Sequence, residues 1–413
     1  MTLIGIVFFI LALLFYYKDI KWLLGLFCIS VTFMAASFLI LGEKGVPLYM
    51  VCEFFIILKT LPYIFNNNLK LKKYEFSLLF FIFISFVILF FSPKIFFDIT
   101  VSLDPTQDNY NGGKPYVSIS NYFQIFYILF HFLALYGVRN YTKYNNSIDF
   151  SNIILNSSLV TLVYGFLFYF SKIKGFYSLF IPIFYNNPGQ EQAAGSFDFL
   201  RYQAGFPEAS YCGAYLGSLF WLAIYSKRYF LSLIIFLALV LTISGTGLAA
   251  FISGLIIFII YKFKNIGNAR NIFILWIVFT VFIVLDSYFN IFDLVYNFIN
   301  NKNDSHSGDV RSSQVLLALS IIENTYLMGI GINVTRGGGF LINLIACTGV
   351  LGLISFIYFL CKMIVGKSVE KEYVFFSALF VAIIVAVPDL SFPFLWASFI
   401  IFVASRKMNR SKF

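Results

Sequence analysis

Charged side chains that could handle a phosphate group lie in two polar segments of an otherwise apolar chain. The first segment carries Arg201 and Glu208, and the second carries His306, Asp309 and Arg311. Arginine presents several N–H donors to phosphate oxygens, whereas a carboxylate or an imidazole can accept a proton from a reacting hydroxyl. These residue types suit a phosphate-bearing substrate or anionic lipid headgroups, although their spacing alone points first to ion pairs with nearby acidic residues.

The first segment runs directly into a predicted helix. Glu208 stands at its start, near the positive end of the helix dipole, and Tyr211 and Tyr215 follow on the same face. Gly213 and Gly217 have the spacing that lets a neighbouring helix approach closely, so we expect them to pack. For Glu208 two interpretations stand: a carboxylate that only caps the helix, or one that lines a polar cleft with Tyr211 and Tyr215.

The second segment continues into a glycine-rich turn that holds another arginine. Residues 312–324 read as an amphipathic helix lying on the outer leaflet, and Arg336 then stands among the glycines at 329, 331 and 337–339. Glycines beside an arginine allow backbone N–H groups to face an anion. A plain surface turn explains the same glycines equally well.

Glu53 and His131 are ionisable residues inside apolar segments. Glu53 must face protein or a water-filled cavity, because exposure of a carboxylate to lipid would cost a few kcal/mol. We expect a structural hydrogen bond from Glu53 to another helix, with a place in a substrate cleft as the alternative. His131 is likewise expected to be a satisfied interhelical donor.

The composition identifies the elements that must position these residues. The 413 residues are 60% hydrophobic and only 12% charged, with a mean hydropathy of +0.86, whereas soluble domains carry about 25% charged residues. We therefore predict an all-α, polytopic membrane bundle of about 13 spans (12–14), forming one transmembrane domain over residues 1–413. The predicted spans are 2–17, 22–41, 46–65, 76–92, 120–138, 152–171, 207–226, 229–243, 246–261, 271–289, 339–361, 373–387 and 392–405.

The scattered charges also exclude some classes of function. The net charge of +10 comes from basic residues between apolar runs and forms no stripe, so a nucleic-acid binder is not expected. The five cysteines form no CxxC pair, and there are only two histidines, so we expect no cofactor and no bound metal. No Walker motif is present, so nucleotide hydrolysis is not expected.

Lysine and arginine predict the orientation. Alternate connections hold 19 basic residues on one side and nine on the other, and basic residues accumulate in cytoplasmic loops. The N-terminus is therefore predicted outside and the C-terminus inside. The long polar connections 93–119, 172–206 and 288–338 then all lie outside, so any chemistry is expected at the outer face.

Motifs over roughly residues 200–360 resemble the bacterial O-antigen polymerase and O-antigen ligase superfamily. In chain order they are Arg201-xxx-Gly205-xx-Glu208, Leu241-Thr-Ile-Ser244-Gly245-Thr-Gly247, Arg311, Met328-Gly329-Ile-Gly331 and Gly349-Val-Leu-Gly352. The ligase branch usually shows a histidine shortly after the Gly-x-Gly segment, where this chain has Arg336-Gly-Gly-Gly-Phe340. That departure favours the polymerase branch.

The resemblance implies a metal-independent glycosyltransferase of the GT-C type in the bacterial plasma (inner) membrane. Its partners would be undecaprenyl-pyrophosphate-linked glycans and membrane lipids, with a chain-length regulator as a further candidate partner, in the biosynthesis of lipopolysaccharide or a related polysaccharide. Arg201 and Arg311 correspond to arginines thought to hold the pyrophosphate, with Arg336 assisting. Glu208 is the first candidate for a base, followed by His306, Asp309 and Glu53. The alternatives are an O-antigen ligase, a lipid-linked oligosaccharide flippase or other transporter, and a membrane scaffold.

Overall fold

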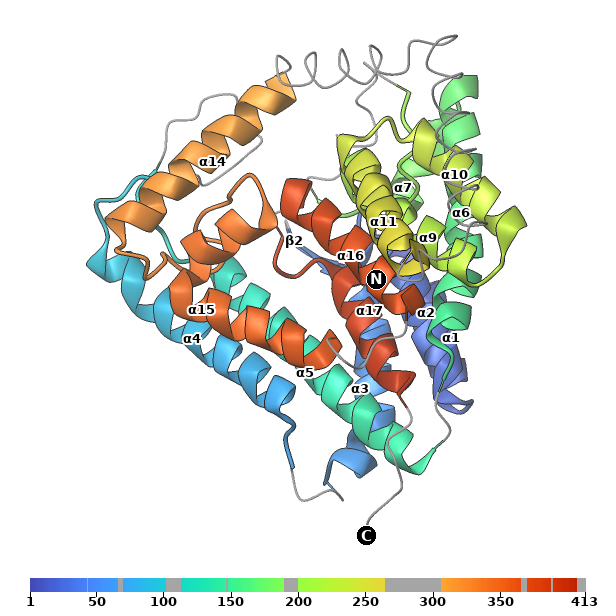
Figure 1. Ribbon diagram of the computed structural model, residues 1–413, viewed down its shortest axis with the longest axis horizontal. Coiled ribbons are helices and arrows are strands. Elements are labelled where there is room, and N and C mark those ends of the chain that lie inside the picture. The colour runs from blue at the N-terminus through green and yellow to red at the C-terminus, as the bar shows by residue number, and fades with distance from the viewer. Residues whose placement is uncertain are drawn as a thin grey trace.

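The chain forms a bundle of helices in the computed structural model, several of which run diagonally across the view in Figure 1. The structure describes residues 1–42, 44–65, 70–101, 113–145, 148–188, 200–263, 306–364, 370–387 and 389–406. Helices make up 74% of the structure and strands 3%, so the predicted all-α class is correct except for one small hairpin in the described residues.

The elements follow the predicted apolar runs closely. Their bounds are α1 Leu3–Tyr16, α2 Ile20–Ser30, β1 Ser37–Leu41, β2 Lys44–Pro47, α3 Leu48–Phe65, α4 Lys73–Ile95, α5 Ile119–Tyr144, α6 Phe150–Lys174, η1 Tyr177–Leu179, α7 Ile181–Phe184, α9 Ala209–Tyr225, α10 Tyr229–Leu241, α11 Gly245–Phe263, α14 His306–Asn324, α15 Phe340–Ile364, α16 Glu370–Ala386 and α17 Pro393–Ala404. The predicted amphipathic helix at 312–324 is part of α14, which begins earlier. The predicted span 271–289 lies outside the described residues.

One predicted span, 22–41, is wrong. Helix α2 ends at Ser30, and β1 pairs antiparallel with β2 instead of continuing the helix. The chain between them bonds to distant loops: the Ala35 N–H donates to the Gly205 carbonyl, at 3.2 Å, and the Ala35 carbonyl accepts from the Asn187 N–H, at 3.1 Å. These partners satisfy backbone groups that a helix would otherwise satisfy itself, so hydropathy alone could not show where α2 ends.

Five helices are long and apolar enough to cross a membrane: α3, α4, α5, α6 and α15. In a bilayer core the backbone must satisfy its own hydrogen bonds, and an apolar helix does so without exposing polar groups to lipid. Helices α1, α2, α10 and α17 are apolar but shorter. The described part of the chain therefore indicates a membrane protein built on an all-α bundle.

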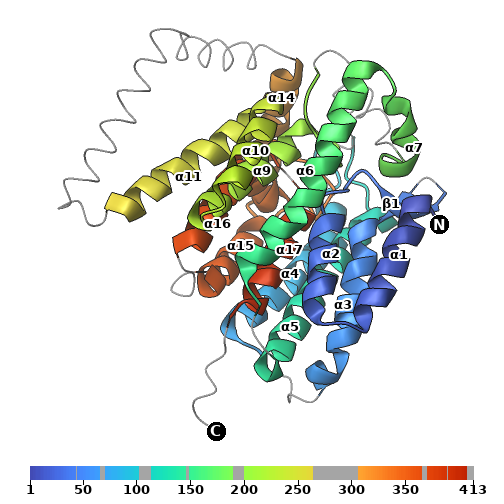
Figure 2. The same ribbon diagram turned by 90° about the vertical axis from the view of Figure 1, so that its right-hand side faces the viewer.

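The helices pack in two neighbouring groups. In one, α4 lies along α15 and α5, and α5 packs on α3 (Figure 1). In the other, α9, α11 and α16 pack against one another, as expected for Gly213 and Gly217. A Cβ at Gly213 would lie 2.9 Å from the Gly247 nitrogen, and one at Gly217 would lie 2.4 Å from the Ala250 Cβ. Helices α1, α2 and α3 stand beside α5 and α6 (Figure 2).

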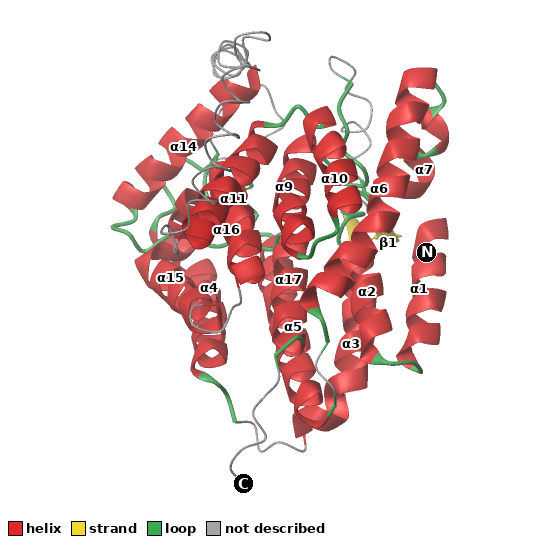
Figure 3. Cartoon of the chain, turned by 45° about the vertical axis from the view of Figure 1, so that its right-hand side comes forward, coloured by secondary structure: helices red, strands yellow, loops and turns green. Residues whose placement is uncertain are grey.

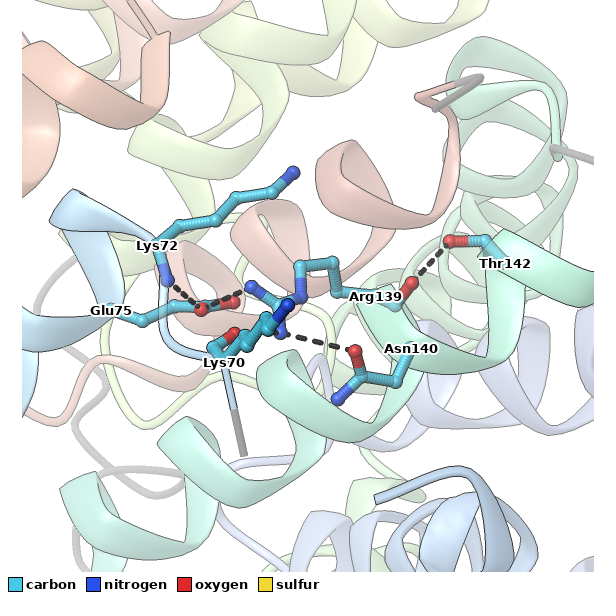
Figure 4. Close-up of polar contacts among 6 residues, drawn as sticks. All are labelled: Lys70, Lys72, Glu75, Arg139, Asn140 and Thr142. Carbon is cyan, nitrogen blue, oxygen red and sulfur yellow. Dashed lines mark hydrogen bonds and ion pairs between the residues drawn. The ribbon is translucent and has the colours of Figure 1, made fainter. Parts of the chain in front are cut away.

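Helices α3 and α5 finish, and α4 begins, at one end of the bundle, which we call the basic end (Figure 3). Arg139, near the end of α5, forms a buried ion pair with Glu75 in the first turn of α4 (Figure 4). Its guanidinium also donates to the Lys70 carbonyl at 3.1 Å and to Asn140 at 3.0 Å. At the same end Lys371 lies 3.9 Å from Asp149, which precedes α6. The alternation predicted from lysine and arginine thus matches which helix ends meet.

Candidate functional site

A cavity of about 570 Å³ opens at the other end of the bundle, in the N-terminal halves of α3, α5, α9, α15 and α17. The C-terminal ends of these helices point toward the basic end described above, so the cavity lies away from the basic residues. The cavity is lined by Met34, Pro47, Tyr49, Gln124, Tyr127, Asn187, Pro207, Glu208, Tyr211, Ile332, Asn333, Thr335, Arg336, Asn343, Asp389, Leu390, Ser391, Phe392 and Pro393.

Arg336 stands at the centre of a charged cluster in this cavity. Its Nη2 lies 3.7 Å from Asp389 Oδ2 and donates to the Tyr211 hydroxyl at 3.1 Å. The Tyr211 hydroxyl in turn donates to Asp389 Oδ2. The Asp389 carboxylate raises the pKa of the Arg336 guanidinium further above its ordinary value, so Arg336 is charged at every physiological pH. About a third of the Arg336 side chain is exposed, which leaves it open to an anion.

The segment that carries Arg336 is held by a break in α15. Gly349 has φ 63° and ψ −174°, a conformation outside the helix, so backbone groups around it are released. The Ile330 and Gly331 N–H groups donate to the Ala346 and Cys347 carbonyls, both at 2.9 Å, and the Val350 N–H donates to the Leu327 carbonyl at 3.0 Å. The glycine cluster therefore anchors the turn by its backbone.

Glu208 lines the same cavity from the start of α9. It occupies the N-cap position, but its side chain makes no capping hydrogen bond. Instead the carboxylate accepts a hydrogen bond from the Ser210 hydroxyl at 2.8 Å, and the residue is exposed. Of the two interpretations of Glu208, the structure thus favours a cleft residue. It brings together three of the predicted site residues: Glu208, Tyr211 and Arg336.

The rest of the lining is neutral. Amide and hydroxyl groups come from Gln124, Asn187, Asn333, Asn343, Thr335 and Ser391, and aromatic rings from Tyr49, Tyr127, Tyr211 and Phe392. The Ser391 hydroxyl donates to Gln124 Oε1 at 2.7 Å, which ties the segment before α17 to α5. Amides that hydrogen-bond hydroxyls, beside rings that cover C–H faces, make a surface suited to sugars.

Other predicted site residues lie elsewhere. Arg201 is exposed and is not among the lining residues; the next residue, Tyr202, bonds through its N–H to the Leu241 carbonyl at 2.9 Å. Tyr215 is buried against Phe206 and Phe394, away from the cavity. His306, Asp309 and Arg311 belong to α14, and their side chains lie outside the described residues.

Glu53 makes the interhelical hydrogen bond that was predicted. Its Oε1 lies 2.7 Å from His131 Nδ1 on α5, and both side chains are fully buried. Neither residue lines the cavity. The separate expectations of an interhelical hydrogen bond for Glu53 and for His131 are thus met by one contact between the two residues.

Asp389 is the charged member of the site that the sequence did not identify. It lies between two prolines, in the break between the predicted spans 373–387 and 392–405. A lone carboxylate inside such a break was the available signal, because a charge between two apolar helices needs a polar surrounding. Gln124, in a helix, and Ser391, in a turn, gave no comparable signal, since neutral polar residues are common in both.

Backbone hydrogen bonds join the motif segments in pairs. Residues 202 and 241 are bonded through their backbones, and residues 327–331 bond to α15 around its break. The paired segments hold Glu208 and Arg336, which lie far apart in the sequence, at one cavity.

Comparisons with protein-family models, with curated proteins and with solved structures find no match to this chain.

Proposed function

We propose that this chain is a membrane glycosyltransferase that polymerises lipid-pyrophosphate-linked oligosaccharide repeat units. The proposal includes an undecaprenyl carrier, the outer face of the bacterial plasma membrane, an external N-terminus and a cytoplasmic C-terminus. The observation that carries it is the placement of Arg336 beside two carboxylates in a cavity otherwise lined by amides, hydroxyls and aromatic rings. Such a cavity suits a sugar joined to an anionic leaving group.

The reaction needs a cation and a proton acceptor, and the cavity offers both. The acceptor hydroxyl oxygen bonds to the anomeric carbon of the growing chain, while the bond from that carbon to the pyrophosphate oxygen breaks. The lipid pyrophosphate leaves with the bonding electrons, and Arg336 stabilises the negative charge that develops on it. The hydroxyl proton passes to a carboxylate, for which Glu208 is our first candidate because Asp389 already pairs with Arg336 and Tyr211.

Arg336 thus takes the first role in holding the pyrophosphate. Arg201 and Arg311, to which the resemblance assigns that role, remain candidates for holding the pyrophosphate together with Arg336. His306 and Asp309 remain secondary candidates for acid–base work on α14. We expect Arg201→Ala and Arg311→Ala to abolish polymer at normal protein levels.

The test is reconstitution of the full chain in proteoliposomes with a defined lipid-pyrophosphate-linked repeat unit, in the presence of EDTA. We expect a ladder of lipid-linked polymer from the wild type, and a slower one from Glu208→Gln. Arg336→Ala should lose about 100-fold or more in rate, as when a group that stabilises the transition-state anion is removed. Arg228→Ala is the matched control, because Arg228 bonds to Asn152 and Asn156 at the basic end of the bundle. No ladder from the wild type, or an unchanged rate in Arg336→Ala, contradicts the proposal.

A carrier is the second candidate, and one observation favours it. The buried Glu53–His131 pair is ionisable and lies inside the bundle, as proton-coupled transporters require. Deletion of the gene separates the functions by the lipid-linked glycans that accumulate. Single repeat units indicate a polymerase, lipid-linked polymer indicates a ligase, and repeat units trapped on the inner leaflet indicate a flippase.

A further inference from the structure

Directly beneath the cavity lies a second layer of side chains on three of the helices that form its walls, α3, α5 and α17. On α3, Tyr49 lines the cavity and Glu53 follows one turn below. On α5, Tyr127 lines the cavity and His131 follows one turn below. Residues separated by one helical turn share a face, so the lower residues project from the same faces as the lining residues.

The lower layer is connected to the cavity walls by specific contacts. The His131 ring lies between two aromatic rings, with centroids 5.9 Å from Tyr49 and 5.2 Å from Trp396 on α17. The Trp396 indole N–H donates to the Leu390 carbonyl at 3.0 Å. Leu390 follows Asp389, the partner of Arg336. The lower layer therefore contacts both an aromatic wall of the cavity and the segment that carries Asp389.

Burying the Glu53–His131 pair in this layer lowers the stability of the fold compared with apolar side chains of similar size. Both side chains are fully buried, and in the described part of the chain Glu53 Oε2 and His131 Nε2 have no hydrogen-bond partner. Burying polar atoms without partners opposes folding, and apolar residues of similar size often replace buried polar pairs without loss of stability. The pair gains directionality instead, because a hydrogen bond fixes the relative position of α3 and α5 more closely than apolar contact does.

We propose that Glu53, His131 and Trp396 are positioning residues that hold Tyr49 and the Asp389 segment in place for the transfer step. The hydrogen bond between Glu53 and His131 sets the spacing of α3 and α5, and the ring stack passes that spacing to α17. The effect on rate rests on the proposed function, whereas the positioning itself does not. None of the three residues contacts the cavity.

The test separates position from stability. Replacing the pair with Glu53→Leu and His131→Phe should leave the melting temperature unchanged or higher, yet lower kcat by about tenfold to a hundredfold with KM within about twofold. Glu53→Gln keeps a carbonyl acceptor for His131 and should restore kcat to within a few-fold of wild type. Thr60→Val, on the same helix but bonded only to its own helix carbonyls, is the control.

Several results would overturn the proposal: a double variant with wild-type kcat, one in which kcat falls only in proportion to lost folded protein, or a Glu53→Gln variant as slow as the double variant. Trp396→Phe keeps the ring but loses the bond to Leu390, and it should also lower kcat.

Tryptophan fluorescence does not require turnover, so it distinguishes failure of the positioning proposal from failure of the proposed function. In a full chain with Trp22, Trp221 and Trp276 replaced by Phe, the emission spectrum of Trp396 should shift in Glu53→Ala and return in Glu53→Gln. Such a shift in a protein that makes no polymer would support the positioning proposal and contradict the proposed polymerase function. Wild-type polymerisation with no spectral shift in Glu53→Ala would support the polymerase function and contradict the positioning proposal.

Discussion

At the scale of single residues, the site depends on a guanidinium kept partly free beside its own counter-ion. Asp389 and Tyr211 hold Arg336 from one side, while about a third of its side chain faces the cavity. A planar guanidinium can keep these contacts and still present further N–H groups to a diphosphate. The ammonium of a lysine is a single point and cannot do both with the same geometry.

Arg336→Lys tests this geometry. We expect the positive charge to be retained and the polymerisation rate to fall by at least about tenfold, less than in Arg336→Ala, because bidentate contact is lost. Single-turnover rates with lipid-linked substrate measure the effect. Equal rates for Arg336→Lys and the wild type would mean that charge alone is needed there.

At the scale of elements, the break in α15 determines where Arg336 stands. The turn at 327–331 bonds to backbone groups near Gly349, and a Cβ at Gly349 would lie 2.3 Å from the Met328 carbonyl oxygen. The break therefore depends on a residue without a side chain. The turn and the helix form one unit, which explains why both are glycine-rich.

We expect Gly349→Ala to destabilise the chain and to lower activity by displacing the Arg336 turn. Gly175→Ala is a matched control, because Gly175 also has a positive φ, of 80°, but a Cβ there meets nothing within 4 Å. Gly175→Ala should lower the stability only by its backbone strain, about 1–2 kcal/mol. Melting temperatures in detergent compare the two, and equal losses would contradict a special role for the break.

At the scale of the whole molecule, the two ends of the bundle carry different chemistry. The basic end is held by ion pairs between helix ends, and the fully buried Arg139–Glu75 pair links α5 to α4. The opposite end holds the cavity. A membrane protein with this division would receive its substrate at one face and be anchored by basic residues at the other.

The Arg139–Glu75 pair should matter most when only one partner is removed. Arg139→Met leaves Glu75 buried without its counter-ion, which should cost about 3–5 kcal/mol and lower the melting temperature. Adding Glu75→Gln to that variant should recover most of the loss. A double variant as unstable as the single one would contradict this account.

Orientation can be tested with exposed lysines at the two ends. Lys44 lies in the hairpin beside the N-terminus, where Thr2 bonds to the Ser37 carbonyl, and Lys18 lies in the α1–α2 turn, contacted by Lys59. In a background with Cys361→Ser, a membrane-impermeant maleimide should label Lys44→Cys in intact cells and label Lys18→Cys only after lysis. The reverse pattern would invert the proposed topology.

The sequence by itself determined the helices and which ends belong together. Apolar runs become helices because a backbone in lipid must bond within its own segment, and most element bounds here follow those runs. The alternation of lysine and arginine also anticipated the gathering of the basic helix ends. Gly213 and Gly217 were predicted to pack because their spacing is local to one helix.

Tertiary structure alone decided where α2 ends and which polar groups meet. Residues 35–37 bond to loops around 186 and 205, and no local pattern predicts such partners. Asp389 and Arg336 lie in different segments, as do Glu53 and His131, and hydropathy carries no information about which face of one helix meets which face of another. The cavity exists because helices from distant parts of the sequence converge there, and such convergence is decided by packing between them.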